Sequence, residues 1–149
     1  MIKTKTNNEF YNLIVVEWGV ELGKFQLITN DDILTLTDED IRKKYLFFGE
    51  EELADIVTFP TLLCDYEDDF CYLGKVKNVD VGERTTTFEF DCVLFNTLQE
   101  TYFKHELLNL SDELQIKNAT ARSELDRIHW AIKRTNLIAT LSDYEKAVA

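Results

Sequence analysis

Residues 70–94 read FCYLGKVKNVDVGERTTTFEFDCVL, and this stretch decides the fold. Two β-like runs, Phe70–Val81 and Thr85–Leu94, flank a short loop that contains Gly82. In the second run Phe88, Phe90, Cys92 and Leu94 alternate with Glu89, Asp91 and Val93, two of which are acidic. Alternation of this kind is typical of a strand with one buried face. The pattern predicts an antiparallel β-hairpin.

Three further strands are expected before this hairpin, at Phe10–Glu17, Leu22–Thr29 and Phe59–Cys64. The first contains Leu13-Ile14-Val15-Val16, which is apolar without alternation and therefore fits a strand covered on both faces. Gly19 and Gly23 lie between the first two runs. We expect these two strands to pair with each other as a second hairpin.

Two short helices are expected between the second and third of these strands. Thr37 is a suitable N-cap for a helix from about Asp38 to Leu46, with acids at its start and Arg42, Lys43 and Lys44 near its end. A second helix begins at Glu50, where Leu53, Ile56 and Val57 follow at helical spacing, and Pro60 must end it.

The last third of the chain changes to a helical period. One apolar stripe runs from Phe95 to Leu110, and a second long helical candidate covers residues 120–148 with a break at Thr135-Asn136. An alternative remains for residues 125–133, because Ile128, Trp130 and Ile132 also suit one face of a strand. These elements predict a single α+β domain over residues 1–149, with residues 1–8 as a flexible start. The expected architecture is an antiparallel sheet or small open barrel packed by short N-terminal helices and by C-terminal helices.

Negative charge is concentrated in residues 31–69, which hold thirteen Asp or Glu and only three Lys or Arg, a net −10 out of the chain's −12. Such a field repels nucleic acid and anionic membranes and attracts basic partners or cations. We therefore expect a protein partner with a basic surface, and neither direct nucleic-acid binding nor a membrane. The mildly basic region near Trp130 also allows pairing of two copies of the chain.

The three cysteines, Cys64, Cys71 and Cys92, lie in or beside β-like runs, and we expect buried reduced thiols. Residues 1–8 lack the apolar segment of a secretory signal, and no window is long and apolar enough for a membrane span. These features favour a cytoplasmic protein.

No familiar catalytic motif is present: the chain has no nucleophile elbow, phosphate loop, His-Glu-x-x-His or Gly-x-Gly-x-x-Gly. No catalytic residue, cofactor or metal ligand is therefore assigned. A zinc site is disfavoured because Cys64 and Cys71 are too far apart in sequence for a usual ligand pair. The acidic stretch Asp65–Asp69 lacks the spacing and the glycine of a calcium loop, which favours a solvated turn between two strands.

Two other positions carry chemistry. His129 lies close in sequence to Glu124 and Asp126, and on a helix either carboxylate could orient its ring, although a packed histidine with a satisfied nitrogen is the more common arrangement. Trp18 and Trp130 are candidate anchors for a partner, against the more common role of tryptophans in a core.

The sequence favours a non-catalytic interaction module, an accessory protein of bacterial or phage type that docks by an acidic surface, with a nucleic-acid-mimicking inhibitor as one specific form. The candidate docking residues are acids in three short runs: Asp38, Glu39, Asp40, Glu50, Glu51, Glu52, Asp65, Glu67, Asp68 and Asp69. The alternative is a small divalent-metal enzyme that uses the acidic cluster Asp65–Asp69, with His129 as an acid or base. The sequence leaves the choice open and leans away from an enzyme.

Overall fold

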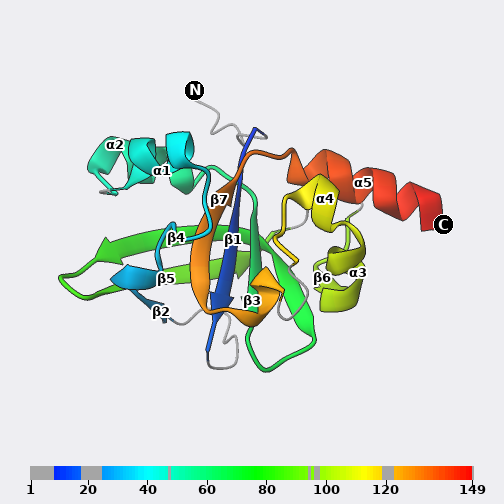
Figure 1. Cartoon of the computed structure of the whole chain (residues 1–149), viewed down its shortest axis with the longest axis horizontal. Helices are drawn as coiled ribbons and strands as arrows, with labels where there is room; N and C mark the ends of the chain where they lie inside the picture. Colours follow the sequence, from blue (N-terminus) through cyan, green and yellow to red (C-terminus); the bar gives the residue numbers. More distant parts are fainter. Residues whose placement is uncertain are drawn as a thin grey trace.

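The computed structural model describes residues 9–17, 25–46, 48–93, 95, 98–118 and 123–148 (Figure 1). The expected flexible start, residues 1–8, and Trp18 lie outside this part of the chain. The elements follow in the order β1 (Tyr11–Val16), β2 (Phe25–Thr29), a 3-10 turn (Asn30–Asp32), α1 (Glu39–Tyr45), α2 (Glu50–Ile56), β3 (Thr61–Asp65), β4 (Phe70–Val81), β5 (Thr85–Cys92), β6 (Thr101–Phe103), α3 (Lys104–Asn109), α4 (Ser111–Leu114), a 3-10 turn (Glu124–Asp126), β7 (His129–Lys133) and α5 (Leu137–Val148).

The strands form a seven-stranded sheet in the order β2-β5-β4-β3-β1-β7, with β6 also paired to β4. The sheet is mixed because β1 and β3 are parallel. Beyond β2, Ile33 bridges to Trp130 of β7, and Leu34 N donates a hydrogen bond to Trp130 O at 2.6 Å. These contacts join the two ends of the sheet, so it closes almost completely into a barrel (Figure 1). The predicted α+β class with a small open barrel is confirmed.

The predicted hairpin is β4 and β5, which pair antiparallel from Gly74↔Cys92 to Val81↔Thr86. Its turn is closed by a hydrogen bond from Gly82 N to Thr85 O at 2.9 Å. The register shifts between Lys77 and Asp80, so β4 contains a bulge, and Asn78 within it has a left-handed backbone with φ of 51°. Bulges bend a strand and increase its twist, and this one helps the long strand β4 curve around the barrel.

Gly74 lies in β4 where two strands flank it, Thr61 of β3 on one side and Cys92 of β5 on the other. A Cβ at this position would lie 1.9 Å from Asp91 O and 2.7 Å from Cζ of Phe90. The backbone of β5 therefore approaches β4 more closely than any side chain would allow. This glycine is required for the tight curvature of the barrel wall.

The expected N-terminal hairpin is wrong. β1 pairs with β3 and β7, whereas β2 pairs with β5. All six residues of β1 are buried, which agrees with its continuous apolar run, but a strand with two buried faces also sits in the middle of a sheet. Its neighbours therefore come from distant parts of the chain.

The two short helices α1 and α2 are confirmed, and α2 ends before Pro60. The expected N-cap is wrong, because Asp38 precedes α1 and Thr37 Oγ1 instead accepts a hydrogen bond from Ile132 N at 3.1 Å. Thr37 thus holds the start of the helix against β7. Its hydroxyl satisfies a backbone amide of that strand, which the sheet leaves unpaired on this side.

The expected helix over residues 95–110 is wrong in its first half. Residues 101–103 form β6, which pairs with Phe70–Tyr72 of β4, and α3 begins only at Lys104. Residues 94, 96 and 97 lie outside the described part of the chain. The free edge of β4 next to the end of β5 supplies hydrogen bonds to β6, and this tertiary pairing outweighs the local helical pattern.

The helix expected over residues 120–148 is wrong for its first half and confirmed for its second. The alternative reading was correct, because residues 129–133 form β7, which pairs antiparallel with β1. α5 begins at Leu137, after the predicted break, and Asn136 Oδ1 accepts a hydrogen bond from Ala139 N at 3.0 Å. No helix of the described residues is long and apolar enough to cross a lipid bilayer.

The barrel wall separates two apolar layers, which we call the inner core and the outer core. The inner core fills the barrel and is closed at one end by α1 and α2; it includes Ile14, Ile41, Tyr45, Ile56, Leu63, Phe88, Phe90 and Trp130. The outer core lies between the other face of β1, β3 and β4 and the helices α3, α4 and α5; it includes Leu13, Val15, Leu62, Leu73, Leu107, Leu114 and Leu141. Figure 1 shows the two helical groups on different sides of the strands.

Cys64 of β3 and Cys71 of β4 form a disulfide, so the expectation of reduced thiols is wrong for this pair. The two residues are directly paired across the strands, with Cα atoms 4.2 Å apart, which places both sulfurs on the same face of the sheet. Cys92 is a free, half-buried thiol. Spacing along the sequence gives no sign of such a pair, because the register of two strands brings it together.

Candidate functional site

The acids of α1 and its N-cap, Asp38, Glu39 and Asp40, are exposed. Asp40 forms an ion pair with Arg134, and Glu39 lies 4.0 Å from Lys43 one helical turn later. The hydrogen bond from Arg134 is the main reason that the pKa of Asp40 lies below its ordinary value. One charge of this group is therefore largely neutralised by the C-terminal region, and the others face solvent.

α2 opens with three consecutive acids, of which Glu50 and Glu51 are exposed and Glu52 is half-buried. The opposite face of α2 carries Ile56 into the inner core, and α1 does the same with Ile41 and Tyr45. Tyr45 Oη also donates to Asp55 Oδ2 at 3.4 Å, which links the two helices. The six acids Asp38, Glu39, Asp40, Glu50, Glu51 and Glu52 thus belong to two neighbouring helices that close one end of the barrel, and we call them the helical acidic surface (Figure 1).

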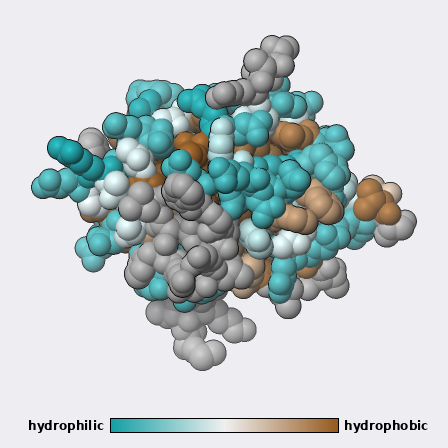
Figure 2. All heavy atoms as spheres, turned by 90° about the horizontal axis from the view of Figure 1, so that it is seen from below, coloured by the Kyte–Doolittle hydropathy of each residue, from teal (hydrophilic) through white to brown (hydrophobic). Residues whose placement is uncertain are grey.

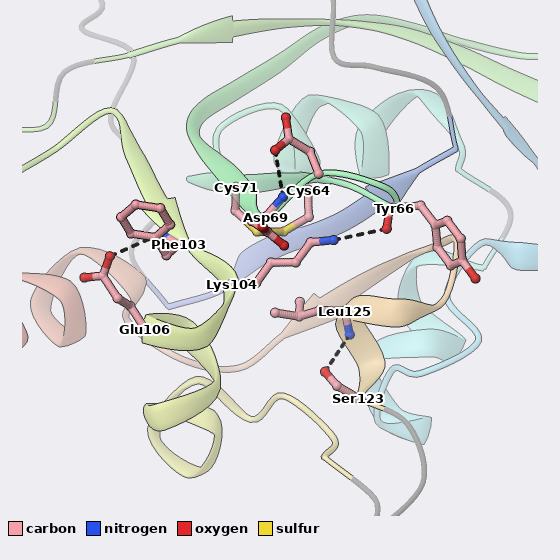
Figure 3. Close-up of a disulfide and its surroundings, with 10 residues drawn as sticks. Cys64, Tyr66, Asp69, Cys71, Phe103, Lys104, Glu106, Ser123 and Leu125 are labelled. Atoms are coloured by element: carbon pink, nitrogen blue, oxygen red, sulfur yellow. Dashed lines mark hydrogen bonds between the residues drawn. A yellow bond between two sulfur atoms is a disulfide. The ribbon is translucent and has the colours of Figure 1, made fainter.

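The acids of the β3–β4 turn are organised differently (Figure 3). Asp65 is buried, and its Oδ1 accepts a hydrogen bond from Glu67 N at 2.9 Å. Asp68 Oδ1 accepts from Asp69 N at 2.7 Å, while Lys104 Nζ donates to Tyr66 O at 3.2 Å. Two of the four carboxylates therefore serve the local turn, which agrees with the predicted acidic turn between two strands.

The two acidic groups lie at opposite ends of β3. α2 precedes Thr61, where the strand begins, and the acidic turn follows Asp65, where it ends. The strand rises by about 13 Å from Thr61 to Asp65, at roughly 3.3 Å a residue. Figure 2 shows one face of the molecule from below, and its described surface is mainly hydrophilic with scattered apolar side chains. The ten candidate docking residues are thus divided into two groups rather than gathered in one.

The pairing of the strands also separates the residues named for a metal enzyme. Asp65 pairs with Val16, whose side chain belongs to the inner core, whereas His129 pairs with Val15, whose side chain belongs to the outer core. Directly paired residues project to the same face, so Asp65 and His129 lie on opposite faces of the barrel wall. Among the described residues, no three His, Cys, Asp or Glu side chains are grouped closely enough to hold a metal ion.

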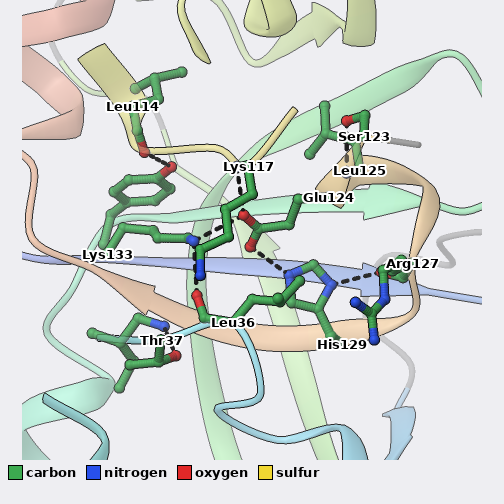
Figure 4. A network of polar contacts seen from close by, with 12 residues as sticks. Leu36, Thr37, Leu114, Lys117, Ser123, Glu124, Leu125, Arg127, His129 and Lys133 are labelled. Atoms are coloured by element: carbon green, nitrogen blue, oxygen red, sulfur yellow. Dashed lines mark hydrogen bonds and ion pairs between the residues drawn. The ribbon is translucent and has the colours of Figure 1, made fainter. Parts of the chain in front are cut away.

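His129 belongs instead to a buried network of charged groups on the outer face of β7 (Figure 4). Its Nε2 lies 2.7 Å from Glu124 Oε2, and Nδ1 donates to Arg127 O at 2.6 Å. Glu124 Oε1 accepts from Lys133 Nζ at 2.8 Å and from Lys117 N at 2.9 Å. Lys133 Nζ also donates to Leu36 O at 2.8 Å. We call Glu124, His129 and Lys133 the buried triad.

Every member of the buried triad is 4% exposed or less. Burial alone would raise the pKa of the Glu124 carboxyl, but hydrogen bonds from His129 and Lys117 N and the charge of Lys133 hold that pKa below its ordinary value. Both nitrogens of the His129 ring are already occupied, so neither is available to a substrate. The network fixes Lys117, residues 123–127 and Leu36 against β7, and its role is structural.

The predicted link between Glu124 and His129 is present, but the expected helix does not create it. Glu124 lies in a 3-10 turn, and its backbone amide donates to Lys117 O at 2.7 Å. His129 is the first residue of β7. Lys133 joins them because residues four apart on a strand face the same side. The spacing of His129 and Lys133 predicts that they share one face only if the segment is recognised as a strand.

Trp130 is fully buried in the inner core, as the more conservative interpretation of this residue predicts. Its ring packs edge to face on Phe48 and Phe88, with centroids 5.3 and 5.2 Å away, and Nε1 donates to Asn12 Oδ1 at 3.1 Å. It is therefore not available as a surface anchor.

An open cavity of about 230 Å³ lies beside the helical acidic surface, and sequence reasoning missed it. Its described lining residues come from three separate parts of the chain: Asn30, Ile33, Leu46, Phe48 and Val81. Leu46 is 44% exposed and Val81 40%, whereas Phe48 is 6% exposed and forms the floor against Trp130. Phe48 has a left-handed backbone with φ of 44°, which is rare for a bulky residue and stores strain next to this opening.

These observations define an α+β protein built on a nearly closed mixed barrel, one end of which is covered by two short helices that carry exposed acids. Comparison of the chain with protein-family models, with curated proteins and with solved structures finds no match.

Proposed function

We propose that this protein is a non-catalytic interaction module that docks the helical acidic surface onto a basic surface of a protein partner. The observation that carries the proposal is the contrast between two kinds of polar group. The buried triad and two carboxylates of the β3–β4 turn are occupied by partners within the chain. In the helical acidic surface, Asp40 is paired with Arg134 and Glu39 lies near Lys43, so the contrast rests on Asp38, Glu50 and Glu51, which are exposed to solvent.

Exposed charge of one sign accelerates encounter with a partner of the opposite sign and rejects partners of the same sign. The helices also present these acids from a rigid base, because Ile41, Tyr45 and Ile56 are anchored in the inner core. Such an arrangement lets the acidic surface keep its shape when it meets a partner, so that little entropy is lost on binding.

Affinity capture from the native host, followed by identification and purification of the recovered protein, tests the proposal. We expect one stoichiometric partner with a basic surface, and an affinity that falls steeply between about 50 and 300 mM salt. The double variant Glu50→Gln/Glu51→Gln should weaken binding by about tenfold at low salt and reduce the salt dependence. Recovery of background proteins alone, or a salt-independent complex, contradicts the proposal.

A matched control is available on α4, where Asp112 and Glu113 are also adjacent exposed acids. The variant Asp112→Asn/Glu113→Gln removes the same charge from a different side of the molecule. It should leave the affinity within about twofold of wild type. Equal weakening by the two variants would show that net charge, rather than the helical acidic surface, governs binding.

The compartment belongs to the same proposal. A cytoplasmic location, which the sequence favours, exposes Cys64 and Cys71 to a reducing environment in which disulfides are rare. Alkylation of free thiols before lysis of the native host, followed by mass measurement, shows whether the Cys64–Cys71 disulfide is present in the cell. One alkylated cysteine, Cys92, means that the bridge is kept; three mean that the cytoplasm reduces it.

A further inference from the structure

The open cavity beside α1 and α2 has the properties of an anchor site. Its described apolar walls are Ile33, Leu46, Phe48 and Val81. The polar lining residue, Asn30, is already engaged: Nδ2 donates to Gly82 O at 2.9 Å, and Oδ1 accepts from Thr86 Oγ1 at 2.8 Å. An occupant therefore meets hydrocarbon and gains little from hydrogen bonding, so the cavity favours an apolar group.

The size of the cavity further limits the range of possible occupants. At about 230 Å³ it is smaller than the roughly 300–1,000 Å³ of sites for cofactors and drug-sized molecules. It is open to solvent on one side, where Leu46 and Val81 are among the more exposed large apolar side chains described. Room for one apolar side chain, with an exposed apolar rim, is the geometry of a pocket that receives an anchor residue from another protein.

The charges around the cavity indicate which residues lie next to the apolar anchor in the partner's sequence. Asp31 and Asp32 lie directly between the lining residues Asn30 and Ile33, and Glu50 follows Phe48 by two positions. These acids adjoin the lining residues along the chain, and Glu50 is shared with the helical acidic surface. The cations that precede Leu46 are engaged nearby, Lys43 with Glu39 and Lys44 over the ring of Tyr45. A segment that places an apolar side chain in the cavity therefore places its neighbours against carboxylates, which favours Lys or Arg on either side.

We infer that the cavity receives one apolar side chain from a protein partner, in a segment whose flanking residues are Lys or Arg. This inference rests on the proposed function and names the partner chemistry of the same surface. Charge brings the segment to α1 and α2, and burial of the apolar anchor in the cavity then slows its release.

Two synthetic fluorescein-labelled peptides test the inference, Lys-Lys-Gly-Leu-Gly-Lys-Lys and the same peptide with Ser in place of Leu. We expect fluorescence anisotropy to give an affinity for the Leu peptide about tenfold above that for the Ser peptide, because only the first buries an apolar side chain. The ratio should fall to about one with the protein variants Leu46→Ser and Val81→Ser. Val148→Ser, which changes an apolar residue that is 65% exposed on α5, should leave the ratio unchanged.

The outcomes separate the two proposals. Equal affinities for the two peptides, both weakened by Glu50→Gln/Glu51→Gln, overturn the anchor site and leave the acidic docking function intact. Binding of neither peptide at about 50 mM salt overturns both. If sedimentation shows that the wild-type chain self-associates and that Leu46→Ser abolishes this, the occupant is a second copy, and the inference of a basic partner segment is wrong.

Discussion

The two faces of β7 are equally buried, yet different forces hold them. Trp130 and Ile132 face the inner core, where contact among apolar and aromatic side chains dominates. His129 and Lys133 face outward, where the carboxylate of Glu124 contacts the imidazole and forms an ion pair with Lys133. Complete burial therefore does not tell which interaction stabilises a residue. The inner face of β7 is stabilised by close packing of apolar side chains, and the outer face by the pairing of charged groups.

The largest expected effect is on the inner face. Trp130→Ala should lower the free energy of unfolding by at least about 4 kcal/mol, because it leaves a large cavity and also removes the hydrogen bond to Asn12. Urea unfolding followed by far-ultraviolet circular dichroism measures the change. A loss below about 2 kcal/mol would mean that the barrel can collapse around the missing ring.

The matching change on the outer face is Glu124→Gln. It leaves Lys133 and His129 buried beside a neutral partner, and we expect a loss of about 3 kcal/mol in the free energy of unfolding. Glu113→Gln, on the exposed surface of α4, is the control and should change stability by less than about 0.5 kcal/mol. Similar values for the two variants would show that the triad contributes nothing.

Acidification separates the two faces further, because the Glu124 carboxyl takes up a proton at low pH and the apolar inner core has no such group. The pKa of Glu124 in the folded protein lies below its ordinary value of 4.5, so its contribution is complete above that pH and is lost as the pH falls through the lower, folded value. The stability difference between wild type and Glu124→Gln should therefore shrink on acidification below about pH 4.5. For wild type and Trp130→Ala it should stay nearly constant.

A substitution at Gly74 tests the close approach of β4 and β5 in the barrel wall, which lies between the two cores. Gly74→Ala forces a Cβ against Asp91 O, so we expect a loss of about 2–3 kcal/mol in the free energy of unfolding and a weaker β4–β5 pairing. Hydrogen exchange of the β4 and β5 amides should show the faster exchange locally. Gly82→Ala, also close to a backbone oxygen but in the turn, provides a comparison, and equal exchange in both variants would contradict a special role for Gly74.

The smallest stability effect is expected for the helical acidic surface. Glu50→Gln/Glu51→Gln should change the free energy of unfolding by less than about 0.5 kcal/mol, since exposed charges away from structural contacts have little effect. Thermal and urea unfolding measure it. A large destabilisation would assign these acids to the fold and remove the argument that they are kept for a partner.

The sequence predicted those parts of the fold that depend on neighbours along the chain. The β4–β5 hairpin, both short helices and α5 follow from alternation, turn residues and Pro60, all of which act locally. The partners of β1 could not be predicted, because they lie about 50 and 120 residues away and nothing in Tyr11–Val16 specifies them. The sequence of β7 is ambiguous, because Ile128, Trp130 and Ile132 suit one face of a strand while residues 120–148 also carry an apolar stripe at helical spacing.

The candidate site shows the same division. The acidic character of residues 31–69 was visible in the composition, but its separation into a helical surface and a turn depends on the direction of β3. The cavity was invisible, because Ile33, Leu46 and Val81 meet only when β2, α1 and β4 are in place. The pairing of Cys64 with Cys71 likewise depends on strand register.

The position of β1 has a consequence for synthesis of the protein. One of the two neighbours of this strand, β7, leaves the ribosome more than a hundred residues after it. Until β7 is made, the edge of Tyr11–Val16 that pairs with it has no partner in the chain. A nascent chain in this state is prone to pair with other chains. Completion of the barrel must therefore wait for β7, and we expect a chain that stops before His129 to aggregate rather than to form a smaller fold.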